Sequence, residues 1–440
     1  MELKKLVITI ILVIGLISCG HDSPQLPNYL NNSPQLNHFF TIFADDYEQI
    51  DDQIKKYTIK KTNDGLFVKQ LPTMRNPKMA TVVTYRAMDN NVGVDLKGHM
   101  NILEEAGSSK YLNLVAFTDG PSDSDSYKYY IKYDTSDVDI MSPYIYASPT
   151  NKELDSGSFE TLRETVNWGF SKYESKFKVL DITSHGSGYQ GACIDDRSNS
   201  IISLPDLGMA IKQGLKGKKL DVINFLACLM GTIEVAYEFR DIAEVMVASE
   251  DSIYGGYAGK YYRGTIGKLS GMQIHQEISA QQLAKLFVLE IDPSDPKSRV
   301  YTLSAIDLTK ISLLKRYMNV LSNNLISKLP QYKKQILNAY NTTPNFDLDE
   351  EGWSGHRDLL TFCNNLIKYV PDNTIKQSCS DVIQILNQVL IIVKGKEGIK
   401  ANGLSIYMPM IGIQDLNKDY LNTKFAKDTS WDTFLIEVLK

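Results

Sequence analysis

Residues 178–183 read KVLDIT and residues 220–227 read LDVINFLA, and a reactive side chain follows each run. Short runs rich in Val, Ile and Leu are typical of strands that are buried on both faces of a parallel sheet. His185 stands just after the first run and Cys228 directly after the second. Functional sites in such sheets lie beyond the carboxyl ends of the strands. The two runs therefore predict an α/β fold with His185 and Cys228 at its functional edge.

Strands and helices are predicted to alternate along the first half of the chain. The strands are expected at residues 80–87, 111–118, 178–183, 220–227 and 245–249, and the helices at 94–106, 159–173, 205–215 and 232–242. This alternation favours a mainly parallel sheet with helices on both faces. Tyrosine-rich residues 127–133 and 144–147 predict a hairpin beside that sheet.

The second half is predicted to be mostly helical. Helices are expected at residues 280–289, 308–326, 331–340, 358–369, 374–393 and 431–439. Two apolar stretches, 301–306 and 403–408, are expected to return to the sheet or its edge. The predicted organisation is a signal peptide (1–18), a tether and N-terminal extension (19–78), an α/β core (79–260) and a mostly helical C-terminal part packed on that core (261–440).

The composition is that of a globular protein. Of the 440 residues, 43% are hydrophobic and 22% are charged, which excludes a disordered or fibrous chain. The formal net charge of −5, without a basic cluster, argues against nucleic acid as a partner. Five cysteines are too few for a disulfide scaffold, although Cys363 and Cys379 could pair in an oxidising compartment.

The N-terminus predicts export. Lys4 and Lys5 precede an apolar run at residues 6–17, which is shorter than the ~20 residues that a membrane-spanning helix needs and fits a signal peptide. The run ends in Leu-Ile-Ser-Cys19, which resembles the lipobox of bacterial lipoproteins, where the cysteine is lipidated. The sequence thus predicts an exported bacterial lipoprotein, anchored in a membrane through Cys19 and facing the periplasm or the cell surface. The alternative is an ordinary secreted protein with an incidental cysteine.

A cysteine and a histidine at neighbouring strand ends could form a nucleophile and its base. A cysteine attacks as the thiolate, and its ordinary pKa of about 8.5 calls for help from an imidazole or a helix N-terminus. The backbone N–H groups of Gly186 and Cys228 could stabilise a developing oxyanion. The alternatives are a buried core cysteine and a histidine that is only a turn residue.

Several motifs resemble the clostripain family of cysteine peptidases, which shares a clan with caspases, legumain and gingipains. They are His-Gly-x-Gly at residues 185–188, ACLM-x-x-x-E-x-AYE at 227–238 and ASE at 248–250. YRAMDNN at 85–91, SAIDL at 304–308 and GLSIYMP at 403–409 extend the resemblance through the second half of the chain. The resemblance implies a caspase-like α/β sandwich with a mainly parallel sheet, helices on both faces and a helical C-terminal part.

The resemblance also implies roles for the two reactive residues. His185 would act as general base and Cys228 as nucleophile, with the amides of Gly186 and Cys228 as the oxyanion hole. A peptide or protein substrate would form an acyl-enzyme on Cys228, which water then hydrolyses. The same chemistry needs no cofactor.

Some clostripain-like enzymes use calcium, so the resemblance allows a calcium ion without requiring one. The candidate acidic residues are Asp119, Asp123 and Asp125, among others. Their spacing is not that of an EF-hand, and it favours a solvated acidic face over a calcium site.

The resemblance fails at one position of the substrate pocket. Family members typically carry an aspartate two residues before the nucleophile, where it lines the pocket for a substrate Arg or Lys; here that position is Leu226. A buried guanidinium without a carboxylate partner is strongly unfavourable. Either the preference has shifted towards an uncharged side chain, or another acid such as Glu250 or Asp251 faces the pocket. Ser249 is a further pocket candidate.

Members of the family are often activated by cleavage at a basic residue between the histidine and the cysteine. Arg197 lies in the polar stretch 195–200, where a surface loop would be open to a peptidase. The sequence therefore suggests self-cleavage after Arg197, and a solvated loop arginine is the alternative.

These observations predict an exported, lipid-anchored cysteine endopeptidase with a His185–Cys228 dyad. The alternative from another class is a surface lipoprotein that keeps a caspase-like fold and binds peptides or proteins without turnover. A peptide ligase would share the acyl-enzyme and would differ only in whether water or an amine intercepts it. No sequence feature favours the ligase.

Overall fold

A computed structural model describes residues 57–62, 65–70, 77–123, 125–147, 153–253, 259–271, 278–294, 300–346, 355–409 and 416–440. The chain divides into two compact units, Met1–Asn76 and Pro77–Lys440. In the first unit the described residues form an antiparallel hairpin of β1 (Tyr57–Thr62) and β2 (Gly65–Gln70). The predicted signal peptide and Cys19 lie outside the described residues. None of the helices in the described part has the length and hydropathy needed to span a membrane.

A nine-stranded sheet forms the centre of the second unit, in the order β15-β12-β11-β10-β7-β3-β4-β5-β6. Its middle consists of five parallel strands: β3 (Lys78–Ala87), β4 (Leu112–Asp119), β7 (Ser175–Thr183), β10 (Leu220–Leu226) and β11 (Ala243–Ala248). Antiparallel strands close both edges: β12 (Thr302–Asp307) and β15 (Leu390–Gly395) on one side, β5 (Tyr127–Tyr130) and β6 (Tyr144–Ala147) on the other. The predicted α/β fold with a mainly parallel sheet is therefore confirmed.

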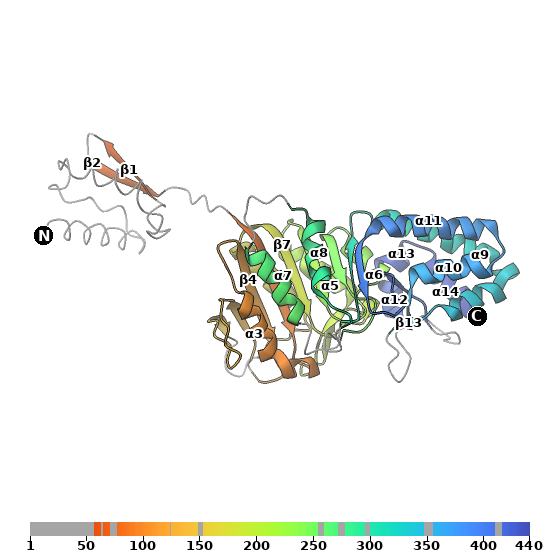
Figure 1. Ribbon diagram of the computed structural model, residues 1–440, viewed down its shortest axis with the longest axis horizontal. Helices are drawn as coiled ribbons and strands as arrows, with labels where there is room; N and C mark the ends of the chain where they lie inside the picture. Colours follow the sequence, from red (N-terminus) through yellow and green to blue (C-terminus); the bar gives the residue numbers. More distant parts are fainter. Residues whose placement is uncertain are drawn as a thin grey trace. The chain divides into compact units, whose positions relative to one another are not determined.

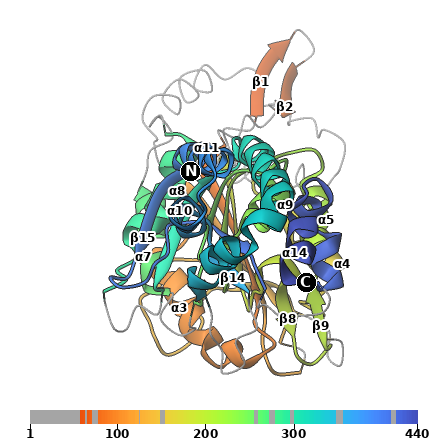
Figure 2. The same cartoon turned by 90° about the vertical axis from the view of Figure 1, so that its right-hand side faces the viewer.

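Strand side chains alternate between two hydrophobic cores, one on each face of the sheet. From β3, Val83 and Tyr85 enter the first core, while Ala80 and Val82 enter the second. The first face is covered by α4 (Phe159–Lys172), α5 (Leu204–Leu215) and α6 (Ile233–Phe239), and the second by α3 (Leu96–Ala106), α7 (Gly259–Gly271) and α8 (Ala280–Glu290). Figure 1 shows α3 and α7 lying over the strands of the sheet, and Figure 2 shows α4 and α5 on the opposite side of the sheet from α7 and α8. The sandwich of helices around the sheet is thus the one that the sequence predicts.

The C-terminal helices extend the first core. They are α9 (Ile311–Thr342), α10 (Leu359–Tyr369), α11 (Asn373–Val389), α12 (Lys418–Asn422), α13 (Lys424–Lys427) and α14 (Trp431–Leu439). Figure 2 shows α9 and α14 in front of the sheet. The Trp431 side chain is wholly buried among them, and its Nε1–H donates a hydrogen bond to the carbonyl of Tyr407, at 2.9 Å.

Two predictions about the second half are wrong. Residues 390–393, expected as the end of a helix, belong to β15, which pairs with β12 at the sheet edge. Residues 403–408 do not return to the main sheet; β16 (Ser405–Tyr407) joins β13 (Asn345–Phe346) and β14 (His356–Asp358) in a separate three-stranded sheet. Apolar runs of this length indicate burial but do not specify the partner strand.

Between the two reactive residues, the polar stretch expected as a loop forms the exposed turn (residues 196–199) of a tight hairpin of β8 (Ala192–Asp195) and β9 (Ser200–Ile202).

Helix boundaries elsewhere differ from prediction. The helix expected at 232–242 ends at Phe239. The two helices expected between 308 and 340 are one, α9, which contains Pro330 and has a kink at Tyr332.

Candidate active site

The pairing of β7 with β10 brings the two reactive residues to neighbouring strand ends. The strands are parallel, and Thr183 pairs with Leu226 in their last register position. The amide of Ser184 continues the ladder, 3.5 Å from the carbonyl of Leu226. His185 and Cys228 therefore each stand two residues beyond a paired position, at the carboxyl edge of the sheet.

Gly186, which follows His185, packs directly against the backbone of the cysteine. A Cβ atom at Gly186 would lie 2.7 Å from the carbonyl oxygen of Cys228 and 2.9 Å from the Cβ of Ala227. Real Cβ atoms do not come that close to other heavy atoms, so only glycine fits here. The segment that carries His185 is thereby held against the segment that carries Cys228.

The backbone N–H of Gly186 points away from the hairpin that follows it. Gly186 pairs with Ala192 in an isolated antiparallel bridge. The bridge is bracketed by hydrogen bonds from Cys193 N to His185 O (3.1 Å) and from Ser187 N to Gly191 O (2.9 Å). In this pattern the central pair exchanges no hydrogen bonds, so the Gly186 N–H faces outward, as an oxyanion donor must.

Cys228 lies on a sharp turn after β10. Leu229, the next residue, has a φ of 61°, in the left-handed region that non-glycine residues avoid. The sulfur atom of Cys228 is 3.3 Å from the amide of Ile253, which donates to it, and 3.5 Å from the carbonyl of Ile253. Cys228 is half-buried, whereas the other thiols of the described part are fully buried (Cys193, Cys363 and Cys379).

The helix N-terminus expected to assist Cys228 lies further along the chain. The turn continues through residues 229–231, Thr232 caps the helix, and α6 begins only at Ile233. The field of a helix terminus falls off within one turn. The dipole of α6 therefore has little effect on Cys228.

His185 is half-buried, and Asn91 holds its ring. Nε2 of His185 donates a hydrogen bond to Oδ1 of Asn91, at 2.7 Å. Because that bond occupies the Nε2 proton, Nδ1 keeps a free lone pair. Burial lowers the pKa of His185 below its ordinary value, and the nearby Asp196 carboxylate opposes part of that shift. A neutral imidazole at pH 7 is the form that accepts a proton.

The side chain of Asn91 was not among the predicted site residues. It lies just beyond the carboxyl end of β3, the strand next to β7, in a short 3₁₀ helix (Asn91–Asp95). The rule that placed His185 and Cys228 at the functional edge also applies to this strand end. A polar Asp-Asn-Asn run directly after a buried strand was the signal that could have revealed it.

Arg197, the predicted cleavage position, is tied to the loop that carries Asn91. Its guanidinium forms ion pairs with Asp89, at 3.4 Å, and with Asp123, and donates to the carbonyl of Pro121, at 2.7 Å. The backbone of Asp196 also donates to the carbonyl of Asp89, at 2.7 Å. Burial and the nearby Asp195 raise the pKa of Asp89 to about 6, against the opposing effect of Arg197. The β8–β9 turn and the Asn91 loop thus form one connected unit.

The predicted pocket residues differ in their access to solvent. Leu226 and Ser249 are buried, and the Ser249 hydroxyl bonds to the backbone of Asp251. Glu250 is wholly buried, and its carboxyl accepts a hydrogen bond from the amide of Gly403. The pKa of Glu250 is raised well above its ordinary value. Burial is the main cause, and the negative charge of Asp358 is the second. Asp251 alone among the four is partly exposed.

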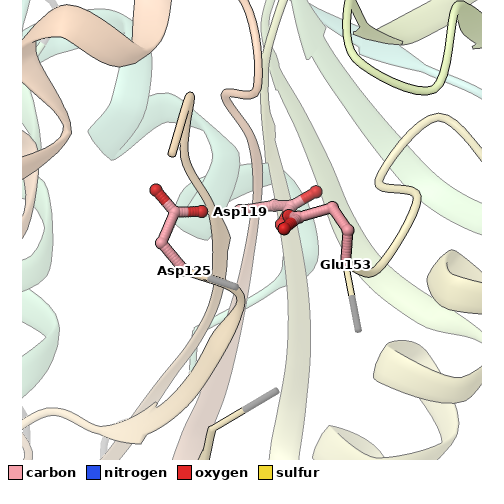
Figure 3. A group of neighbouring side chains, drawn as sticks. All are labelled: Asp119, Asp125 and Glu153. Carbon is pink, nitrogen blue, oxygen red and sulfur yellow. The ribbon is translucent and has the colours of Figure 1, made fainter. Parts of the chain in front are cut away.

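Three carboxylates gather near the end of β4. One oxygen each from Asp119, Asp125 and Glu153 lies within 4.8 Å of the others, and Figure 3 shows the three groups turned towards one another. Asp119 is wholly buried and Asp125 partly so, which corrects the expectation of a solvated acidic face for these two residues. Asp123, by contrast, is exposed. Burial raises the pKa of Asp119 to about 8.

The predicted cysteine pair lies in the C-terminal helices, away from these groups. Cys363 of α10 and Cys379 of α11 are both buried free thiols. The pKa of Cys363 is raised above its ordinary value, chiefly by a hydrogen bond with Cys379 and secondly by burial.

Comparison with known proteins agrees with this geometry. The sequence model of the clostripain family matches residues 85–437. Clostripain of Hathewaya histolytica is 27% identical over 447 residues, which cover 85% of this chain and 84% of that protein.

Solved structures of similar fold include two C11 cysteine proteases. A secreted one from Bacteroides thetaiotaomicron, in complex with an irreversible peptide inhibitor, superimposes with a TM-score of 0.58 at 16% identity, covering 81% of this chain and all of that one. An inactive zymogen from Parabacteroides distasonis gives 0.58 at 18% identity, covering 80% and 98%. These structures share the caspase-like fold, and the family match spans most of the sequence. The chain therefore belongs to the clostripain family and is a cysteine peptidase.

Proposed function

We propose that this peptidase is an endopeptidase that uses His185 and Cys228 as a catalytic dyad. The observation that carries the proposal is the register of β7 and β10, which sets both residues two positions beyond a paired Thr183 and Leu226. The half-buried state of Cys228, among buried thiols, supports its assignment as the nucleophile.

The proposed reaction begins with transfer of the Cys228 thiol proton to Nδ1 of His185, the nitrogen left free by Asn91. The thiolate attacks the scissile carbonyl, and the oxyanion is held by the N–H groups of Gly186 and Cys228. The imidazolium returns the proton to the leaving amine, which leaves an acyl-enzyme on Cys228. His185 then takes a proton from water as the water attacks the thioester, so that a carboxylic acid and the free thiol are released.

Thiol labelling tests this assignment against a binding protein without turnover. Cys228 should react with iodoacetamide at least about tenfold faster than Cys193, because burial raises the pKa of Cys193 and the thiolate fraction falls tenfold per pKa unit. Mass spectrometry of labelled peptides measures both rates, and His185→Ala should slow only Cys228. Equally slow labelling of both thiols would favour the binding protein.

The proposed residue preference differs from that for Arg or Lys. Leu226 supplies no charge, and Glu250 is wholly buried, with its carboxyl bonded to the amide of Gly403 and its charged form disfavoured by burial. Asp251 is the remaining acid of the predicted pocket that reaches solvent. We therefore expect uncharged side chains before the scissile bond to be preferred.

A peptide library varied at the residue before the scissile bond measures the side-chain preference directly. Wild type and Asp251→Asn should show similar profiles led by uncharged residues. Strong cleavage after Arg that Asp251→Asn abolishes would instead identify Asp251 as the counterion. Strong cleavage after Arg in both proteins would contradict the proposed shift in preference.

Self-cleavage after Arg197 is a competing proposal, because it requires a pocket that accepts Arg and therefore excludes the shift towards uncharged residues. The turn at residues 196–199 is exposed, which favours access, although the Arg197 guanidinium must first leave Asp89 and Asp123. Intact mass after incubation should show two fragments for wild type and one species for Cys228→Ala. Arg197→Gln should also remain intact, and identical single species in all three proteins would exclude self-cleavage.

Export and lipid anchoring complete the proposal. The similar Bacteroides thetaiotaomicron enzyme is described as secreted, and residues 1–19 of this chain have the pattern of a lipoprotein signal. Wild type should partition into detergent after membrane fractionation, whereas Cys19→Ser should lose the lipid. Equal partition of the two proteins would contradict an anchor on Cys19.

A further inference from the structure

We propose that Glu250 and Asp358 share one proton, and that this shared proton stabilises the turn that carries Cys228 (residues 228–231, the Cys228 turn). Glu250 stands two residues beyond the end of β11, and Asp358 ends β14 and caps α10. Both side chains are wholly buried, and the two carboxyl groups are hydrogen-bonded to each other. Two carboxyl groups can form such a bond only if one of them carries a proton. The inference rests on the proposed role of Cys228 as the nucleophile.

The hydrogen-bond donors around the pair indicate which residue carries the proton. Oδ1 of Asp358 accepts from the amide of Thr361 (2.6 Å) and from Nδ2 of Asn402 (2.8 Å), and Oδ2 accepts from the amide of Asn402 (2.8 Å). Glu250 accepts only from the amide of Gly403, through Oε2, and its Oε1 meets no donor in the described part of the chain. Donors stabilise the charged form of a carboxyl group. Asp358 is therefore the carboxylate, and Glu250 is the acid that donates to it from Oε1.

The charges around Glu250 also favour the protonated state. The charged groups that act on it most strongly are Asp358 and Asp251, and both are acidic. Arg357, next to Asp358 on β14, directs its guanidinium to two backbone carbonyls. Ser304 of β12 packs on the same turn of the chain and carries no charge. Loss of the shared proton would therefore place two negative charges side by side in the interior, without an opposing charge to offset their repulsion.

The two segments that the pair joins hold the Cys228 turn from both sides. On one side, the amide of Gly231 donates to the carbonyl of Ser249, at 2.7 Å, in the segment that carries Glu250. On the other side, the amide of Ser405 donates to the carbonyl of Gly231, at 2.9 Å. Ser405 follows directly on the residues 402–404, whose amides bond to the two carboxyl groups. The shared proton thus joins both supports of the Cys228 turn.

This arrangement makes the position of the Cys228 turn sensitive to pH. The pKa of Glu250 is raised well above its ordinary value, chiefly by burial. A group of this kind contributes its full stability at low pH, and the contribution is lost as the pH rises through the pKa of the folded state. Ionised Glu250 would repel Asp358 and separate the two supports. Residues 228–231 should then become less ordered at alkaline pH.

Hydrogen exchange of the full chain with the Cys228→Ala substitution tests the shared proton without any peptidase activity. Glu250→Gln in that background keeps a neutral donor of the same shape, and parent and variant are compared at the same pH. Peptides that cover residues 229–232 should exchange equally near pH 6. At about pH 9 they should exchange at least about tenfold faster in the parent, because only the parent loses the proton. Glu164→Gln, which changes an exposed acid on α4, is the matched control and should follow the parent at both pH values.

Steady-state kinetics of the chain that retains Cys228 measure the consequence for catalysis. Wild type and Glu250→Gln should have equal kcat near pH 6, and the variant should have a kcat at least about threefold higher at about pH 9, because its Cys228 turn stays in place. KM should change little. A merely structural role for Glu250 would not produce this dependence on pH.

Equal exchange in parent and Glu250→Gln at about pH 9, or faster exchange in the variant near pH 6, would overturn the inference. The expected difference in exchange without any difference in kcat would support the shared proton and count against Cys228 as the nucleophile, so the two failures are distinguishable. Circular dichroism checks that the variant is folded. If it is not, Asp358→Asn takes its place with the same expectations, because an amide there also supplies the hydrogen bond without a titrating proton.

Discussion

At the scale of single residues, Asn91 determines which nitrogen of His185 can act as a base. Its Oδ1 fixes the proton on Nε2, at 2.7 Å, so the reactive lone pair lies on Nδ1. A histidine in the wrong tautomer keeps its place but cannot accept the thiol proton. Asn91 is thus a positioning residue for the proposed dyad.

Asn91→Ala should lower kcat about 10- to 100-fold and leave KM nearly unchanged, because the imidazole loses orientation but substrate contacts remain. Asn91→Asp should recover part of the rate, since a carboxylate also accepts from Nε2, and should move the acid limb of the pH profile upward. Steady-state kinetics across pH measure both effects. An alanine variant with wild-type kcat would show that Asn91 has no part in catalysis.

The pH profile should reflect the lowered pKa of His185. Burial disfavours the imidazolium, so the neutral base persists to lower pH than an exposed histidine, whose pKa is about 6.5. The acid limb of kcat/KM should therefore have its midpoint below that value. Asp196→Asn removes the charge that favours the imidazolium and should shift the limb further down. A midpoint above the ordinary value, or an upward shift in the variant, would contradict this account.

Gly186→Ala should impair catalysis by crowding Cys228, the proposed nucleophile. The new Cβ would meet the Cys228 carbonyl at 2.7 Å, and a displacement of that segment by a fraction of an ångström misaligns the thiol and the oxyanion donors. We expect kcat/KM to fall about 100-fold. Gly267→Ala in α7, where a Cβ meets nothing within 4 Å, is the matched control and should retain full activity. Equal activity of the two variants would remove Gly186 from the site.

At the scale of elements, the sequence predicts the strands of the sheet better than their partners. The five central parallel strands were all expected close to where they lie, because buried strands have an unmistakable apolar pattern. Residues 390–393 were expected in a helix and residues 403–408 in the main sheet or at its edge, because a short apolar run indicates burial but specifies neither the type of element nor the partner strand. The choice of partner strand depends on tertiary contacts between residues that are far apart in the sequence, so a short stretch of sequence cannot reveal it.

The site was predictable only where a residue follows a central strand directly. His185 and Cys228 satisfy that rule, and Asn91 would have satisfied it had the run after β3 been read in the same way. Asp119 and Asp125 were candidates for their acidic side chains, but their convergence with Glu153 was not predictable. Asp119 ends β4, and Glu153 lies 28 residues further along the chain than Asp125, so folding alone brings the three together.

The contact between the end of β11 and the turn before β16 should depend on pH. Glu250 is buried there against Gly403 N, and burial raises its pKa. A carboxyl with a raised native pKa binds its proton more tightly when folded, so this contribution to stability is full below the unfolded pKa of about 4.3 and declines as pH rises.

Glu250→Gln should therefore raise the thermal unfolding midpoint at pH 7 to 8 and have little effect near pH 4, because it keeps a neutral side chain of the same shape. Melting curves at several pH values measure the difference. A variant that is less stable than wild type at neutral pH would indicate that Glu250 is ionised in the folded protein. The residue preference before the scissile bond should not change.

At the scale of the whole molecule, the C-terminal helices belong to the same folded unit as the central sheet. They share a continuous hydrophobic core with the sheet face that carries α4, α5 and α6, and β15 adds to the sheet itself. Trp431 is buried at the centre of this packing, in contact with Phe362 and Phe434. The last helix thus contributes to the stability of the sheet from which the site is built.

Trp431→Ala should lower the free energy of unfolding by about 3–5 kcal/mol, the usual cost of a large buried aromatic side chain. It should also leave the carbonyl of Tyr407 without its donor. Trp168→Ala, which removes a partly buried ring on α4, should cost clearly less. Chemical denaturation measures both, and equal losses would show that the C-terminal helices contribute little to the shared core.

The pairing of β7 with β10 has a consequence for a nicked molecule. The proposed base follows one strand and the proposed nucleophile follows its neighbour, with the β8–β9 turn between them along the chain. A broken backbone in that turn leaves both strands in the sheet, each hydrogen-bonded to partners on both sides. Such a protein would give two bands on a denaturing gel. It would nevertheless elute from a sizing column as one particle that contains both His185 and Cys228.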